Sequence, residues 1–317
     1  MPNSKPLSLF WKKALLGAGV VLAVAGWAEL RLRRMPTLYH LKRDGLSAAA
    51  PGMQILVLGA SQANQGLDPG VWPVPGYNAA CVGQDAYYDE ALFEAWLPRL
   101  PRLRHLVLAI SMVSLDSTLM ETAETWRSFA YSQSFGLANE SPALAGDLRN
   151  WSALALSEPW PALQLAAHGF VDANAVTLTA QGFQAMPGIP EDELDLRLNE
   201  LTAGKRWRYH EGNFKAADLG PNTARYQKML ALAAASKVQV SLVIFPVDAS
   251  YAAAVPAPAV ARRLRLLKAL AKEGPARVFD YFKDPRFNSK DFADVDHLNQ
   301  DGARKFSQIL WKEALHD

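Results

Sequence analysis

A serine stands directly after a short apolar run in the stretch ILVLGASQANQGLDP, residues 55–69. Ser61 follows Gly59 and Ala60, two small residues that let the backbone turn sharply and project the hydroxyl group. Such a serine can act as a nucleophile if a base lies nearby, or it can simply cap a helix. The stretch lacks the G-K-S/T and G-x-G-x-x-G patterns of phosphate and dinucleotide loops. Ala63 also replaces the second glycine of the G-x-S-x-G elbow of α/β hydrolases.

A base and a carboxylate that could orient it occur together near the C-terminus, in FADVDHLNQDGARKF, residues 292–306. Asp294 precedes His297 by three residues, so one turn of chain could bring its carboxylate to Nδ1 and leave Nε2 free to face a serine. The same polar, turn-like stretch also fits a surface loop that ends in a helix cap. Taken together, the two stretches predict a nucleophilic site built from Ser61, His297 and Asp294.

The elements that must position these residues alternate along the chain. The strand candidates lack strict polar alternation, as parallel strands buried on both faces do, and they cover residues 54–59, 105–111, 238–246 and 276–281. Amphipathic helix patterns cover residues 85–97, 223–236, 257–274 and 300–316. This alternation predicts a three-layer α/β/α sandwich with a mostly parallel sheet. Ligands of such sheets bind outside the carboxyl ends of the strands, where Ser61 stands.

The remaining segments set the expected domain boundaries. Residues 1–34 are predicted to be a membrane anchor, residues 35–52 a polar connector, and residues 53–317 the α/β domain. Within that domain, the pattern breaks at about residues 112–220, which we interpret as an insertion or cap over one end of the sheet.

Composition excludes several classes of function. Half of the residues are hydrophobic and the net charge is +2 without a recurrent basic block, which argues against nucleic-acid binding. The single cysteine, Cys81, excludes an intrachain disulfide and a cysteine-based zinc site. No pair of histidines has metal-ligand spacing and no cofactor fingerprint is present, so neither a metal nor a cofactor is expected.

The N-terminus contains an uncharged run, ALLGAGVVLAVAGWA, at residues 14–28. With Leu30 it reaches about 17 residues, the short end of what crosses a bilayer, and Trp11 and Trp27 stand near its ends, where indoles favour the interface. A cleaved signal peptide is the rival interpretation, but an arginine cluster follows VAGWAEL and makes a poor cleavage site. Basic residues flank both ends, so charge alone does not orient the span.

The two motifs together resemble those of the SGNH, or GDSL-like, hydrolase superfamily. The resemblance implies a flavodoxin-like fold in which Ser61 is the nucleophile, His297 the base and Asp294 the residue that orients it. Ala60 replaces the usual aspartate of the G-D-S block. Gly83, in YNAACVGQDAYY, falls on the second block, whose glycine amide joins that of the serine in the oxyanion hole.

The third block departs from the family pattern. Its G-x-N-D asparagine normally completes the oxyanion hole, but the corresponding stretch here reads LAISMVSLD, residues 108–116. Ser111 or Ser114 could substitute, or the hole could rest on the amides of Ser61 and Gly83 alone. The loss of one such donor typically costs about 10²–10³ in rate, so the departure bears on activity more than on fold.

The anchor and the patterns GxS…GLDP and D..HLN..G resemble the extracytoplasmic proteins that accompany membrane-bound O-acyltransferases in polysaccharide modification. They also resemble the D-alanyl transfer proteins of teichoic acid systems. The resemblance implies a single-pass protein of the cytoplasmic (inner) membrane with its globular domain in the periplasm. It implies a serine esterase or O-acyltransferase that acts on acyl esters of cell-surface polysaccharide, with acetyl the expected group and a membrane-bound O-acyltransferase as a candidate partner.

The sequence is also compatible with two functions of other classes. The missing asparagine is compatible with a catalytically inactive scaffold or a carbohydrate-binding subunit of an envelope assembly. A nucleotide-binding flavodoxin-like domain is the third possibility, although the loop GASQANQG carries no cofactor fingerprint.

Overall fold

The computed structural model describes residues 5–169, 177–212 and 220–316. The chain divides into two compact units. One unit, called the helical unit, consists of residues 1–37 and 141–176; the other, called the α/β unit, consists of residues 38–140 and 177–317.

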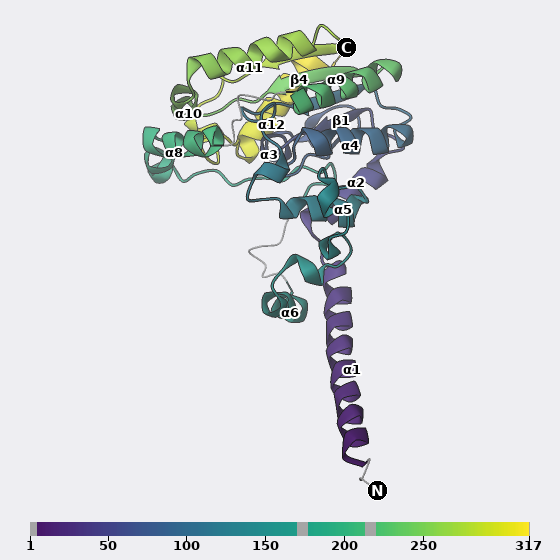
Figure 1. Cartoon of the computed structure of the whole chain (residues 1–317). Helices are drawn as coiled ribbons and strands as arrows, with labels where there is room; N and C mark the ends of the chain where they lie inside the picture. The colour runs from purple at the N-terminus through teal and green to yellow at the C-terminus, as the bar shows by residue number, and fades with distance from the viewer. Residues whose placement is uncertain (1–4, 170–176, 213–219, 317) are drawn as a thin grey trace. The chain divides into compact units, whose positions relative to one another are not determined.

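A five-stranded, all-parallel sheet forms the centre of the α/β unit (Figure 1). Its strands stand in the order β2-β1-β3-β4-β5, the order of flavodoxin-like folds. The bounds are β1 (Ile55–Leu58), β2 (Gly76–Asn78), β3 (His105–Ala109), β4 (Gln239–Ile244) and β5 (Ala276–Asp280). The α/β class and the parallel sheet predicted from the alternating pattern are therefore confirmed.

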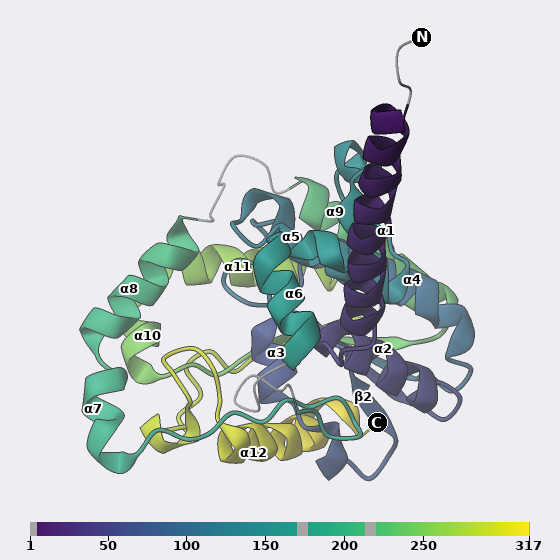
Figure 2. The same ribbon diagram turned by 90° about the horizontal axis from the view of Figure 1, so that it is seen from below.

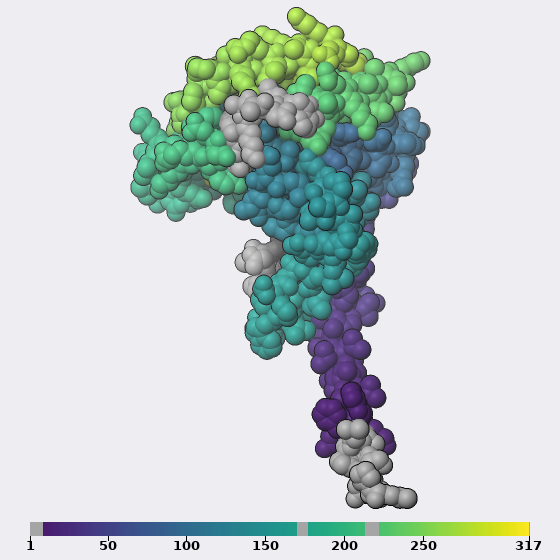
Figure 3. Space-filling view, in the orientation of Figure 1, coloured from purple at the N-terminus to yellow at the C-terminus, as the bar shows by residue number. Residues whose placement is uncertain are grey.

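Alternate residues of each strand face two separate hydrophobic layers, because side chains of a strand point to opposite faces. Leu56 and Leu106 pack with the helices α4 (Ala86–Trp96), α9 (Gly220–Ala235) and α11 (Ala257–Leu270). Val57 and Val107 pack instead against α3 (Ser61–Gly66) and α12 (Gln300–Leu310). The helices α3 and α12 pack together on that face (Figure 2). The helices α9 and α11 contact each other in the opposite layer, and Figure 3 shows the green atoms of α9 beside the yellow-green atoms of α11.

The sequence did not predict one strand of the sheet, nor a helix in the expected connector, nor the helices that lie within residues 112–220 and directly after β4. The strand β2 has only three residues, with glycine at one end and asparagine at the other, so it leaves no hydrophobic run. The helix α2 (Leu38–Ala49) occupies most of the segment that was expected as a polar connector. Tyr39, Lys42 and Leu46 form its buried stripe, and the lysine in that stripe hides the helical pattern.

Several shorter helices complete the α/β unit. The segment at residues 112–220 contributes α5 (Trp126–Phe135), α7 (Leu194–Arg197) and α8 (Glu200–Glu211) to this unit, while its central part belongs to the helical unit. The helix α10 (Ala249–Ala254) follows β4, and a π-helical turn (Trp311–Leu315) extends α12.

The helical unit contains α1 (Lys5–Arg33) and α6 (Pro159–His168). The last turns of α1 pack on α6, where Ala28 and Leu32 are buried together with Ala162 and Ala166. Residues 9–33 of α1 are long and apolar enough to cross a membrane, a test of length and composition that a signal sequence also passes.

Candidate active site

Ser61 owes its position to the sharp turn that follows β1. Gly59 has a φ of +132°, and a Cβ atom there would lie 2.6 Å from the Cβ of Ala109 on the neighbouring strand. Only glycine fits this position without strain. Ala60 is the N-cap residue of α3 and Ser61 is its first residue, so the alternative in which Ser61 itself caps a helix does not hold.

The Ser61 hydroxyl instead contacts His297. Ser61 Oγ and His297 Nε2 lie 2.8 Å apart, although 236 residues separate them in the chain. His297 follows β5 in a tight loop, which is closed by a bridge between Phe292 and Leu298. Both residues stand beyond the carboxyl ends of their strands, where parallel α/β sheets place their sites.

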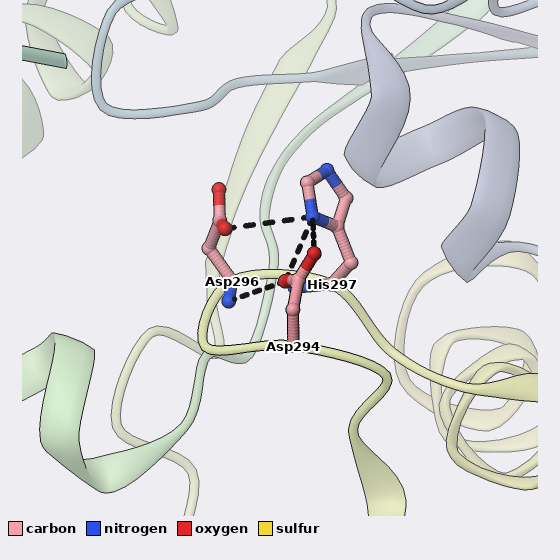
Figure 4. A group of neighbouring side chains, drawn as sticks. All are labelled: Asp294, Asp296 and His297. Carbon is pink, nitrogen blue, oxygen red and sulfur yellow. Dashed lines mark hydrogen bonds and ion pairs between the residues drawn. The ribbon is translucent and has the colours of Figure 1, made fainter. Parts of the chain in front are cut away.

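Asp294 holds the other ring nitrogen of His297. Its Oδ1 and Oδ2 lie 2.9 and 3.0 Å from His297 Nδ1 (Figure 4). Asp294 Oδ1 also accepts hydrogen bonds from the backbone amides of Asp296, at 3.0 Å, and His297, at 2.8 Å. The backbone turn between Asp294 and His297 therefore holds the Asp294 carboxylate in place. The structure brings Ser61, His297 and Asp294 together in one hydrogen-bonded chain.

A second carboxylate at this histidine was not assigned a role from the sequence. Asp296 is buried, and its Oδ1 lies 3.4 Å from His297 Nδ1 (Figure 4). Arg206 of α8 donates from Nε to the same oxygen at 2.8 Å, and His210 Nε2 lies 3.8 Å from Oδ2. No local sequence signal joins α8 to this loop, because 90 residues separate Arg206 from Asp296.

The charges around His297 favour its protonated form. Burial alone would lower the pKa of His297, but the carboxylates of Asp296 and Asp294 outweigh burial and raise that pKa above its ordinary value. Burial likewise opposes the charge of Asp296, yet His297 and Arg206 hold its pKa far below the usual range. The two carboxylates thus stabilise the imidazolium that forms when His297 takes up a proton.

His210 behaves in the opposite way. Burial lowers the pKa of His210 to about 4, so this imidazole is neutral near pH 7. Its Nδ1 lies 2.5 Å from the hydroxyl oxygen of Tyr251. The neutral ring therefore connects Tyr251 to the Asp296–Arg206 pair without adding charge to the site.

A cavity of about 200 Å³ opens beside Ser61. Gly83, with a φ of +71°, lines it, and so do Ser111 and Ser114. The amides of Ser61 and Gly83 donate to no acceptor among the described residues, which leaves them available to a ligand oxygen. Ser111 and Ser114 bind each other through their hydroxyl oxygens at 2.9 Å.

Asp294, Asp296 and His297 also satisfy a geometric test for a metal site, since one ligand atom from each lies within 4.8 Å of the others. Their groups already have partners within the protein. Arg206 neutralises Asp296, and Asp294 accepts two backbone amides, so both carboxylates are satisfied by protein groups.

Comparisons with known proteins identify no family for this chain: no protein-family model matches it, and no curated protein matches it.

Proposed function

We propose that the chain is a serine esterase or O-acyltransferase of the SGNH type, with Ser61 as the nucleophile. The observation that carries the proposal is the 2.8 Å contact between Ser61 Oγ and His297 Nε2, together with the contact from Nδ1 to Asp294. A nucleophile, a base and a group that orients the base are the three parts that acyl transfer through a serine requires.

In the first half-reaction, Ser61 Oγ attacks the carbonyl carbon of an ester while His297 Nε2 takes the hydroxyl proton. The carbonyl oxygen becomes an oxyanion, which the amides of Ser61 and Gly83 stabilise. When the tetrahedral intermediate collapses, the alcohol leaves with the proton from His297 and the acyl group stays on Ser61. Asp294 keeps the proton on Nδ1 throughout and stabilises the imidazolium.

In the second half-reaction, an acceptor hydroxyl gives its proton to His297 while its oxygen attacks the acyl carbon. The bond from that carbon to Ser61 Oγ then breaks, and His297 returns the proton to the serine oxygen. Water as the acceptor yields a free acid, and a sugar hydroxyl yields a new ester. We propose acyl esters of cell-surface polysaccharide as substrates and a membrane-bound O-acyltransferase as a partner.

We further propose that α1 remains attached as a membrane anchor and that the α/β unit lies in the periplasm. The C-terminal end of α1 has partners within the helical unit, which supports retention. The Glu29 carboxylate accepts hydrogen bonds from the Ser152 hydroxyl and from the amides of Ala153 and Leu154. Cleavage after Ala28 would remove this buried residue from the contact with α6 and would leave Glu29 at the new N-terminus.

A fluorophosphonate probe tests the proposed chemistry, because it labels only serines that are activated as nucleophiles. We expect the full-length protein in detergent to be labelled and the Ser61→Ala variant to remain unlabelled. Ser157, an exposed-loop serine of the helical unit, provides the matched control as Ser157→Ala, which should be labelled like the wild type. Absence of labelling in the wild type would support the inactive scaffold instead.

A further inference from the structure

An arginine without a hydrogen-bonding partner among the described residues lines the same cavity as Ser61. Arg263, on α11, is 4 % exposed, and its Nε and Nη2 atoms are buried without a hydrogen-bond partner. Its guanidinium carbon lies 4.8 Å from the centre of the Phe282 ring, which also lines the cavity. Burial lowers the pKa of Arg263 to about 10, so the group stays charged near pH 7.

The other charged residues that line this cavity already have partners. Arg206 pairs with Asp296, and Glu124 pairs with Arg127. Asp85 accepts hydrogen bonds from the amides of Tyr88 and Leu119. Among the described lining residues, Arg263 is therefore the one charged side chain whose hydrogen-bonding capacity is left unused. The negative charge of Asp280 favours the charged form of Arg263 but makes no hydrogen bond to it among the described residues. A buried charge whose hydrogen bonds are not made is costly to a folded protein, which suggests that a ligand completes it.

The two unsatisfied atoms define the kind of group that would fit. Nε and Nη2 lie on one edge of the guanidinium, which can bind both oxygens of a carboxylate through two parallel hydrogen bonds. Both atoms are covered here, so the side chain has to turn this edge toward the cavity when a ligand binds. We propose that Arg263 binds a carboxylate of the substrate while Ser61 attacks its ester group. The substrate is then an ester that carries a carboxylate, either on its acyl group or on an acidic sugar. The inference rests on the proposed function for the attack at Ser61.

Paired substrates test the preference and locate the carboxylate. For the acyl side, para-nitrophenyl butyrate is compared with the para-nitrophenyl half-ester of succinic acid. For the sugar side, an O-acetylated methyl glucoside is compared with the matching O-acetylated methyl glucuronoside. We expect wild type to have the higher kcat/KM for the acidic member of one pair, and that pair identifies the source of the carboxylate.

The variant Arg263→Met should reduce the ratio of kcat/KM for the acidic ester to that for the neutral ester by about tenfold to a hundredfold. This is the effect expected when hydrogen bonds to a charged group are lost. Arg262→Met is the matched control, because Arg262 is the neighbouring arginine and pairs with Asp116 outside the cavity lining. It should keep the wild-type preference. A wild type that prefers the neutral ester in both pairs, or an unchanged preference in Arg263→Met, overturns the proposal.

A binding measurement separates failure of this inference from failure of the proposed function. In the Ser61→Ala background, succinate or glucuronate should raise the melting temperature, glucose should not, and the further change Arg263→Met should abolish the rise. If this holds while wild type resists the fluorophosphonate, the carboxylate site stands and the esterase proposal falls. If wild type is labelled but no carboxylate stabilises the protein, the carboxylate proposal alone falls.

Folding of the variant is not expected to obscure the result, since Arg263→Met removes an unpaired buried charge and keeps a long side chain. Arg263→Lys serves as a second variant should the methionine variant fail to fold. It retains the charge but loses the edge with two donors, so the preference for the acidic ester should fall in that variant too.

Discussion

Asp296 directly precedes His297 in the chain, yet its carboxylate oxygen Oδ1 comes within 3.4 Å of His297 Nδ1. Asp294 approaches the same nitrogen at 2.9 Å from a more exposed position. Two carboxylates thus act on one ring nitrogen, but only Asp296 is buried and paired with an arginine. The two positions should therefore affect a reaction at Ser61 differently.

The first prediction concerns the sharing of roles between these carboxylates. The change Asp294→Asn should lower kcat for a para-nitrophenyl ester by about ten- to a hundredfold, less than the roughly 10⁴-fold loss in a triad with a single carboxylate. Asp296 should still hold the proton on Nδ1 in that variant. The double variant Asp294→Asn/Asp296→Asn should lose more than either single variant. A loss in Asp294→Asn as complete as that in Ser61→Ala would contradict the shared role.

The second prediction concerns pH. His297 can take a proton from Ser61 only when the imidazole is neutral, so kcat/KM should rise with pH through the pKa of His297. The negative charge of Asp296 raises that pKa. The change Asp296→Asn should therefore lower it and move the rising limb of the profile to lower pH, by about one unit or more.

The control for the pH profile is Asp284→Asn, because Asp284 forms its ion pair with Arg286 away from His297. Its profile should overlay that of the wild type. A limb that stays in place in Asp296→Asn, or that moves to higher pH, would show that Asp296 does not set the basicity of His297.

The third prediction concerns the turn that presents Ser61. Gly59→Ala should reduce the free energy of unfolding by about 1–3 kcal/mol, because the residue has a positive φ and its new Cβ would meet Ala109. The backbone has to move to relieve the contact between the new Cβ and Ala109. This movement should displace Ser61 and slow its labelling by a fluorophosphonate. Gly52→Ala is the control: a Cβ there meets nothing within 4 Å, so the change should stay within about 0.5 kcal/mol. Urea unfolding of the full-length protein in detergent measures the free energy of unfolding of both variants. Equal losses of stability in Gly59→Ala and Gly52→Ala would refute the role of Gly59.

The fourth prediction concerns the side of the membrane. Lysines precede the apolar span and arginines follow it, so the positive-inside rule does not decide the orientation of the protein in the membrane. Chemistry on surface polysaccharide requires the α/β unit outside the cytoplasm, so a C-terminal alkaline phosphatase fusion should be active. A C-terminal GFP fusion exported in the unfolded state should be dark. A fluorescent GFP fusion with an inactive phosphatase fusion would overturn the proposed orientation and the envelope role.

Much of the fold follows from local pattern. The four longer strands carry short apolar runs, and the helices that cover them carry amphipathic stripes, so periodicity alone reveals their type and order. Parallel strands then place their carboxyl ends at one edge, which is why the position of Ser61 behind β1 already indicated a site. Asp294 and His297 are three residues apart and lie in one turn of the chain, so their proximity could be predicted from the local sequence.

Other features depended on tertiary contacts. The strand β2 is too short to show a period, and it is a strand only because its three residues, Gly76–Asn78, pair with Ile55, Leu56 and Val57 of β1. The stripe of α2 contains Lys42, which is buried because its ammonium group donates to the carbonyl oxygens of Asn78 and Gly182. Neither acceptor is near Lys42 in the chain, so no local pattern could predict the burial.

The sequence by itself determined the α/β class, the apolar N-terminal helix and the three residues Ser61, Asp294 and His297, because each depends on runs or spacings within a few residues. Only the tertiary structure decided that Ser61 and His297 touch and that Arg206 pairs with Asp296. It also decided that Arg263 lines the cavity with Nε and Nη2 free of hydrogen bonds to any described residue. These relationships join segments separated by tens to hundreds of residues. These contacts depend on burial and on the charges of neighbouring side chains, and those side chains become neighbours only after the sheet and its helices have packed.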